Sequence, residues 1–176
     1  MKSVEARVSG LVFDQKQQQH VVLLRETDGE RVLPIWIGPA EALAIQRLLS
    51  GQVFPRPLTH DLFALVLEGL HARVSRVTIV EMREGTFFAT LVIERENSVL
   101  SVDARPSDSV AIALRTQSAL YVNEELLQAP PEQGSELETP PDDPPPAPEP
   151  TDEEKAEQLR RFLEKLNPED FGKFQM

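Results

Sequence analysis

Three charged side chains stand close together where a predicted strand gives way to a predicted helix. Asp103, Arg105 and Asp108 occur within six residues, after the apolar run 99–102 and before an aliphatic stretch. We expect the hydroxyl of Ser107 to cap this helix. Exposed N–H donors and the positive end of a helix dipole suit a phosphate or carboxylate ligand at such a junction.

These residue types could support metal-assisted cleavage of a phosphodiester bond, which needs carboxylates to hold Mg²⁺ or Mn²⁺ and a base. Asp103 and Asp108 are the predicted metal ligands and catalytic residues, and Glu41 is a further catalytic carboxylate. His60, at the start of another predicted helix, or a metal-bound water would act as the base. The predicted substrate-binding residues are Arg105, Arg56 and Ser107, with the arginines holding a phosphate through paired hydrogen bonds.

Four of these residues, Asp103, Arg105, Asp108 and His60, also have a purely structural interpretation. Asp103 and Arg105 could form an ion pair that fixes the turn between strand and helix, and Asp108 could serve only the helix dipole. His60 could be an ordinary helix-start residue. The sequence contains no Gly-rich phosphate loop and no nuclease motif of fixed spacing. The residues alone leave both interpretations open.

The apolar pattern predicts the elements that must position these side chains. Predicted strands cover residues 4–13, 20–25, 31–37, 73–82, 86–95, 99–102 and 120–122, and predicted helices cover 39–50, 59–71, the residues from 107 onward, and 123–128. Thr59 is the expected N-cap of the second helix. The expected core-facing residues of that helix are Leu62, Phe63, Val66, Leu67 and Leu70. This order predicts an α+β fold, with a mixed or antiparallel sheet and helices packed on one face.

Two residues of the third predicted strand carry further expectations. Pro34 cannot donate to a strand ladder, so it favours an edge position or a bulge. Trp36 is the only tryptophan. We expect it to line the core or a pocket wall, with base stacking as the alternative.

An internal similarity links two of the predicted helix starts. Residues 38–45 (GPAEALAI) align without gaps on residues 105–112 (RPSDSVAI). Chance is the alternative explanation, because proline followed by an acidic residue is common at helix starts. A degenerate duplication would place Glu41 and Asp108 at equivalent first-turn positions beside a shared cleft. Helices that start at unrelated places would contradict it.

Four longer motifs follow one another along the chain: residues 33–38 (LPIWIG), 41–45 (EALAI), 56–62 (RPLTHDL) and 103–115 (DARPSDSVAIALR). Together they resemble the bifunctional nuclease family of bacteria and plants, over about residues 2–127. The resemblance implies a divalent-metal-dependent enzyme that hydrolyses DNA and RNA. The alternative is a non-catalytic binding or regulatory module that recognises an anionic ligand or a protein partner.

The charge distribution bears on this choice. The net charge of −11 divides into −3 for residues 1–129, with 13 basic and 16 acidic side chains, and −8 for residues 130–176, with 5 and 13. Phosphate affinity depends on lysine and arginine, so this balance favours the binding module. A local patch could reverse that argument, and its candidates are Arg47, Arg56, Arg73, Arg76, Arg105 and Arg115.

The chain divides into three predicted parts: a domain at 1–129, a linker at 130–150 and an amphipathic helix within 151–176. The linker holds nine of the 15 prolines and is predicted to be disordered. The helix has an unpaired apolar stripe made of Leu159, Phe162, Leu163 and Leu166. This stripe and short edge strands predict a homo-oligomer. The sequence shows no signal peptide, no membrane span and no cysteine, so we expect a cytoplasmic protein without disulfides.

Overall fold

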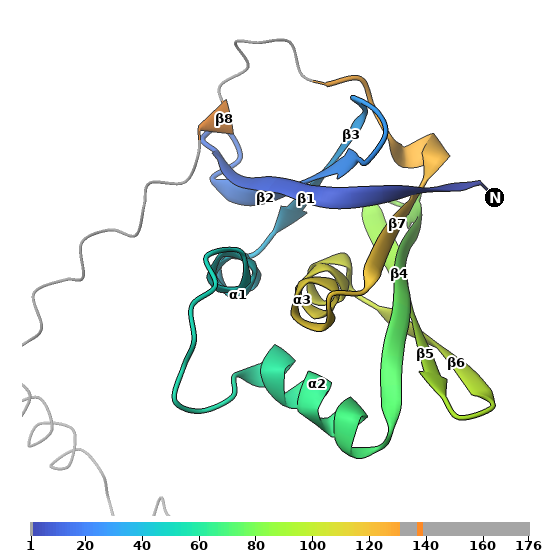
Figure 1. Cartoon of the computed structure of the whole chain (residues 1–176). Coiled ribbons are helices and arrows are strands. Elements are labelled where there is room, and N and C mark those ends of the chain that lie inside the picture. Colours follow the sequence, from blue (N-terminus) through green and yellow to red (C-terminus); the bar gives the residue numbers. More distant parts are fainter. Residues whose placement is uncertain (1, 131–136, 139–176) are drawn as a thin grey trace, which may run out of the picture. The chain divides into compact units, whose positions relative to one another are not determined.

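The computed structural model describes residues 2–130 and 137–138 (Figure 1). The strands are β1 (Ser3–Asp14), β2 (Gln19–Glu26), β3 (Val32–Ile37), β4 (Ala72–Arg83), β5 (Thr86–Arg95), β6 (Ser98–Ala104), β7 (Ala119–Asn123) and β8 (Leu137–Glu138). The helices are α1 (Pro39–Leu49), α2 (Thr59–Gly69), α3 (Pro106–Thr116) and the short 3₁₀ helix η1 (Glu124–Leu126).

The strands form one mixed sheet in the order β3-β2-β1-β7-β4-β5-β6, and β8 pairs separately with β1. Strands β4 and β7 run parallel, whereas the other neighbouring pairs are antiparallel. The predicted α+β class is therefore confirmed. Strand β3 forms an edge of the sheet, as Pro34 predicted.

The helices pack on one face of this sheet, with α3 in the middle. Helix α3 contacts both α1 and α2, and Figure 1 shows it beside α1 and next to β7 and β4. Most of α3 is buried, including Val110, Ala111 and Ile112. Its aliphatic side chains meet those of the strands, such as Val77 and Val122, in one hydrophobic core. This central position places the first turn of α3 close to the start of α1.

The sheet order shows two similar units within the described residues. Strands β1, β2 and β3 form an antiparallel meander that leads into α1, and β4, β5 and β6 form another that leads into α3. Both helices follow an extended N-cap residue, Gly38 or Arg105, and both begin with proline. The helix starts lie side by side, as the internal alignment predicted. The duplication itself stays a prediction.

Several local predictions were wrong. Arg105 and Leu58 are the N-caps of α3 and α2, because Ser107 and Thr59 already lie inside the helices. The predicted helix at 123–128 is only the 3₁₀ turn η1, since Leu127 returns to extended backbone. On α2 the core-facing assignment fails for three residues: Leu62, Val66 and Leu70 are exposed. In α2 only Leu67 is fully buried, because this helix touches the core along a narrow line.

An ion-pair network joins the β2–β3 hairpin to η1. The Arg31 guanidinium donates to both carboxylate oxygens of Glu26, with Nε–Oε2 at 2.9 Å and Nη2–Oε1 at 2.8 Å. It also donates to Glu124 at 3.2 Å, and the Lys2 ammonium lies 2.9 Å from the same carboxylate. We call Arg31, Glu26 and Glu124 the Arg31 group. It links segments from the two ends of the folded region.

The predicted helix within 151–176 and most of the predicted linker lie outside the described residues. Within the linker range, Leu137 and Glu138 form β8 and pair with Asp14 and Phe13 of β1. Among the helices that the structure describes, none has the length and apolar character needed to cross a bilayer. The homo-oligomer stays a prediction.

Candidate functional site

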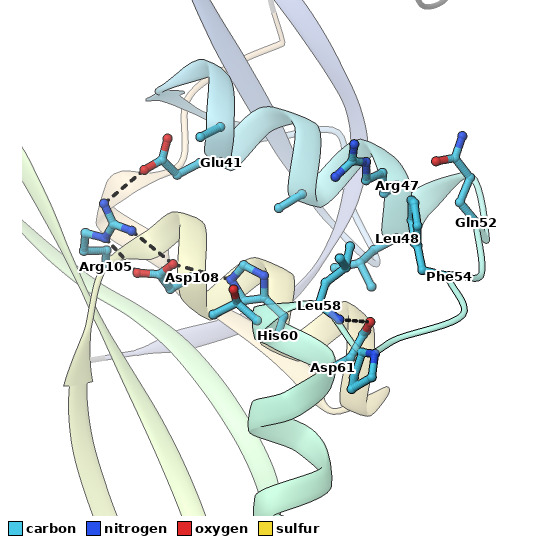
Figure 2. A pocket seen from close by; sticks show the side chains of 14 residues that line it. Glu41, Arg47, Leu48, Gln52, Phe54, Leu58, His60, Asp61, Arg105 and Asp108 are labelled. Carbon is cyan, nitrogen blue, oxygen red and sulfur yellow. Dashed lines mark hydrogen bonds and ion pairs between the residues drawn. The ribbon is translucent and has the colours of Figure 1, made fainter. Parts of the chain in front are cut away.

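A cleft of about 570 Å³ opens where α1, α2 and α3 begin (Figure 2). The first turns of α1, α2 and α3 contribute Glu41, His60 and Asp108, and the N-cap of α3 contributes Arg105. The end of α1 and the connector to α2 complete the wall. We call this the main cleft. Helix starts present unpaired N–H groups and a positive dipole end, so their convergence favours an anionic ligand.

Arg105 joins the two related helix starts. Its Nε and Nη2 donate to the two carboxylate oxygens of Asp108, at 2.7 and 3.2 Å. Its Nη1 donates to Oε1 of Glu41 at 3.1 Å, across 64 positions of sequence. We call Arg105, Asp108 and Glu41 the Arg105 group. The equivalent first-turn carboxylates thus share one guanidinium, at one end of the main cleft in Figure 2.

Electrostatic interactions keep Asp108 and Arg105 charged. Partial burial alone would raise the pKa of Asp108, but hydrogen bonding and charge from Arg105, helped by His60, lower the pKa below its ordinary value. The hydrogen bond to Asp108 and the charge of that carboxylate raise the pKa of Arg105. Asp108 and Arg105 therefore remain an ion pair near neutral pH.

His60 lies within reach of this group. Its Nε2 is 3.5 Å from Oδ1 of Asp108, and its side chain is 20% exposed. The neighbouring Asp61 fixes this part of α2, because its carboxylate accepts the N–H of Leu58 at 2.9 Å. The same carboxylate lies 2.9 Å from Nε of Arg115 in the last turn of α3. These bonds hold His60 at the cleft.

The opposite end of the main cleft is apolar and aromatic. The Arg47 guanidinium lies 5.1 Å from the centre of the Phe54 ring, a cation–π geometry. Leu48 and Leu58 line the wall beside this pair. Figure 2 shows Arg47 and Phe54 at one end and Arg105 at the other, with His60 and Leu58 between them. The cleft therefore offers a charged end and a stacking surface.

The structure brings together four of the seven predicted site residues: Glu41, His60, Arg105 and Asp108. Asp103 lies on β6, where its neighbours Val102 and Ala104 pack toward the core. Strand alternation turns its exposed side chain to the opposite face of the sheet. Arg56 is exposed in the connector and lines no cleft described here, and Ser107 is 8% exposed in the first turn of α3.

These positions bear on the predicted metal site. In the part of the chain that the structure describes, no group of three or more histidine, aspartate or glutamate side chains lies close enough to hold a metal ion. Of the two predicted ligands, Asp103 faces away from the helices on β6, whereas Asp108 lies on α3 in the main cleft. Glu41 and Asp108 both face Arg105, whose guanidinium lies between them. This arrangement does not by itself fit a metal ion.

Sequence reasoning missed Phe54 and the apolar end of the cleft. Arg47 was a candidate only for a basic patch, and Phe54 belongs to a Pro-rich connector with no periodic pattern. An exposed aromatic residue seven positions after an arginine is a weak signal without the connector's path. The fold supplies that path by turning the chain back after Ser50, the C-cap of α1.

Comparison with known proteins identifies the family of this chain. The family description "bifunctional nuclease domain" matches residues 22–133. An uncharacterised protein of Mycobacterium tuberculosis is 42% identical over 167 residues, which cover 95% of this chain and 97% of that protein. Bifunctional nuclease 1 of Oryza sativa subsp. japonica is 27% identical over 108 residues, which cover 59% of this chain and 33% of the rice protein. The chain therefore belongs to the bifunctional nuclease family.

Proposed function

We propose that this protein hydrolyses phosphodiester bonds of DNA and RNA in the main cleft. The observation that carries this proposal is the convergence of Arg105, Asp108, Glu41 and His60 in one cleft at three helix starts. Family membership and the name of the rice relative support it. Carboxylates, an imidazole and a guanidinium gathered in a cleft favour catalysis over the binding module.

Arg105 would bind the scissile phosphate. Its side chain is 65% exposed, and a guanidinium has more N–H donors than its three present bonds to Asp108 and Glu41 use. The remaining donors on Nη1 and Nη2 can therefore reach a phosphate oxygen while the group stays assembled. The planar guanidinium suits the paired oxygens of a phosphate. The nearby helix starts add N–H donors and positive potential.

His60 would act as the general base. In this role its imidazole takes a proton from the attacking water, the water oxygen bonds to phosphorus, and the bond to the leaving oxygen breaks. The leaving oxygen then takes up a proton from solvent, and the protonated imidazole returns its proton to solvent. Asp108, ionised beside Arg105, would orient the imidazole and stabilise its protonated form. Asp108 is a positioning residue in this scheme.

The requirement for Mg²⁺ or Mn²⁺ is a separate part of the proposal. Two carboxylates and one guanidinium give the Arg105 group a net charge of −1 when His60 is neutral. A divalent cation would offset the repulsion between this charge and a phosphate. Because the described side chains form no three-ligand group, no step above passes through a metal ion.

The test is cleavage of linear DNA and single-stranded RNA by purified protein, with Mg²⁺, with Mn²⁺ and with EDTA. Asp108→Asn and His60→Ala are the informative variants. We expect His60→Ala to lower the cleavage rate about 100- to 10,000-fold, the usual contribution of a general base. Loss of activity in EDTA would support the metal requirement.

Asp103→Asn is the matched control, because it removes a carboxylate five positions from Asp108 but on the other face of the sheet. We expect its cleavage rate to equal that of the unmodified protein. Equal rates in all four preparations would indicate a contaminating nuclease and overturn the proposal. Loss of activity in Asp103→Asn alone would move the site to the outer face of β6.

A further inference from the structure

We propose that the site acts on single-stranded nucleic acid, whose unstacked bases lie against aromatic side chains on both sides of Arg105. This inference rests on the proposed function and names its substrate class. It excludes an intact duplex as the preferred substrate. Its basis is a second cleft that adjoins the main one.

The second cleft has a volume of about 300 Å³ and is lined by Trp36, Phe87, Gly38 and Ser107, among others. Glu41 and Arg105 line both clefts, so the Arg105 group forms the boundary between them. We call this second hollow the side cleft. A chain crossing from one cleft to the other would place its backbone over Arg105.

Each cleft has an exposed aromatic side chain. Phe54 is 37% exposed in the main cleft, and Trp36 is 41% exposed in the side cleft. The Trp36 indole is held in place, because its Nε1 donates to Oδ2 of Asp14 at 3.2 Å. Aromatic rings that are exposed yet oriented are suitable platforms for nucleobases. In a duplex the base faces are already stacked, so these platforms can serve only bases that have left the stack.

The charges of the clefts agree with this preference. Among the described residues, Arg47 and Arg105 are the only lysine or arginine side chains that line either cleft. Duplex binding through the backbone uses many more phosphate contacts. Stacking on aromatic side chains adds affinity that does not depend on cations. It therefore lessens the difficulty posed by a domain whose net charge is −3 over residues 1–129.

The test uses fluorescence of Trp36, the only tryptophan of the chain. A single-stranded oligothymidylate or oligouridylate of about 10 nucleotides is titrated into the full-length protein, first in EDTA and then with Mg²⁺. A duplex of equal length is titrated in parallel. We expect the single strands to quench the fluorescence at concentrations where the duplex does not. With two arginine contacts, the logarithm of the association constant for the single strand should fall with the logarithm of the salt concentration, at a slope of about −1.4.

Two variants locate the platforms, with labelled oligonucleotide anisotropy as the readout. We expect Trp36→Leu and Phe54→Leu each to weaken single-strand binding about 5- to 150-fold. Phe88→Leu is the matched control, because the Arg83 guanidinium lies 5.2 Å from the Phe88 ring but Phe88 lines neither cleft. We expect its affinity to be unchanged.

The outcomes separate this inference from the proposed function. Suppose that nucleic acid is cleaved, but that duplex and single strand bind equally or both platform variants bind like Phe88→Leu. The single-strand inference is then wrong, and the proposed nuclease function is not contradicted. If no single strand binds with or without Mg²⁺, the inference is also overturned. Absence of both binding and cleavage overturns the two together.

Discussion

Two arginines of this protein each bind two carboxylates, but they do so in different surroundings. Arg31 donates to both oxygens of Glu26 and to Glu124, and Arg105 donates to both oxygens of Asp108 and to Glu41. In each case the ion pairs raise the pKa of the arginine. The Arg31 group lines neither of the two clefts, whereas the Arg105 group separates them and lies beside His60.

The difference shows that a cluster of ion pairs does not by itself indicate a site. Arg31 is 38% exposed and ties a hairpin to η1, while Arg105 is 65% exposed and retains donors that face a cleft. The two groups have the same chemistry, so each is the natural control for the other. Parallel substitutions in the two groups test this distinction.

The largest expected effect is on catalysis. Arg105→Ala should lower the cleavage rate about 100- to 1,000-fold, the usual loss when a donor to the transition state is removed. Arg31→Ala should leave that rate unchanged. Single-turnover rates of both variants on one single-stranded substrate provide the measurement. Equal losses in both variants would show that Arg105 acts only through the fold.

The next effect concerns geometry at constant charge. Arg105→Lys keeps the positive charge but loses the planar pair of donors, so we expect activity well below that of the unmodified protein. Arg31→Lys should behave in the assay like the unmodified protein. Steady-state rates with substrate titration would show whether the loss lies in kcat or KM. Full activity in Arg105→Lys would mean that charge alone suffices.

The loss of thermal stability should rank the two alanine variants in the reverse order. Both variants lose ion pairs to two carboxylates, but Arg31 is 38% exposed and Arg105 is 65% exposed. Exposed ion pairs contribute less to stability, so the thermal midpoint of Arg31→Ala should fall more than that of Arg105→Ala. Scanning calorimetry at neutral pH measures both midpoints. A larger fall in Arg105→Ala would assign the Arg105 group a mainly structural role.

The difference in thermal midpoint between Arg31→Ala and the unmodified protein should depend on pH, because it depends on the ionisation of Glu26 and Glu124. Hydrogen bonding to Arg31 lowers the pKa of Glu26 from its ordinary value of 4.5. Hydrogen bonding to Lys2, with a smaller contribution from Arg31, lowers the pKa of Glu124 from the same ordinary value. A lowered pKa in the folded protein stabilises it above that ordinary value, and the stabilisation disappears as the pH falls through the folded pKa. The midpoints of Arg31→Ala and the unmodified protein should therefore converge below about pH 4.5. A constant difference down to pH 3 would contradict this.

The smallest effect should come from Gly38, which occupies the N-cap position that Arg105 has in the other unit. A methyl group on Gly38 would meet Oε2 of Glu41, the flexible end of that side chain. Gly38→Ala should therefore displace the carboxylate from Arg105 and lower activity less than Arg105→Ala does. Its unfolding free energy should fall by about 1 kcal/mol or less.

Gly69→Ala at the end of α2 is the control for this change, since open space surrounds its added methyl group. Denaturant titration and the cleavage assay on both variants complete the comparison. Activity of Gly38→Ala equal to that of Gly69→Ala would show that Glu41 does not contribute through Arg105.

Much of this arrangement could be predicted from sequence. Alternating apolar residues predicted the strands of the sheet from β1 to β7, and proline at the first helical position predicted the start of α1. The start of α3 was predicted at Ser107, one residue after Pro106, where the helix begins. The alignment of residues 38–45 with 105–112 predicted that Glu41 and Asp108 would lie in equivalent places. The bond from each to Arg105 makes that equivalence visible.

The remaining features depend on neighbours that no local pattern specifies. Asp103 and Asp108 are five positions apart, but one belongs to a strand of period two and the other to a helix, so they point to different faces. Arg56 lies in a connector whose path is set by tertiary contacts. The apolar pattern of α2 is helical, yet Leu62 and Val66 are exposed. The periodicity of apolar residues predicts that a helix has an apolar face, but it does not predict which part of the protein packs against that face.

The place of β7 in the sheet has a consequence for how the protein is made. Strand β7 comes after β6 and α3 in the sequence but lies between β1 and β4, so it alone connects the two meanders within the sheet. During synthesis from the N-terminus, the two halves cannot share a sheet before residues 119–123 leave the ribosome. A nascent chain that ends at α3 already contains Glu41, His60, Arg105 and Asp108. It lacks the strand that joins the two meanders, so we expect the proposed nuclease activity to be absent until β7 has been added to the sheet.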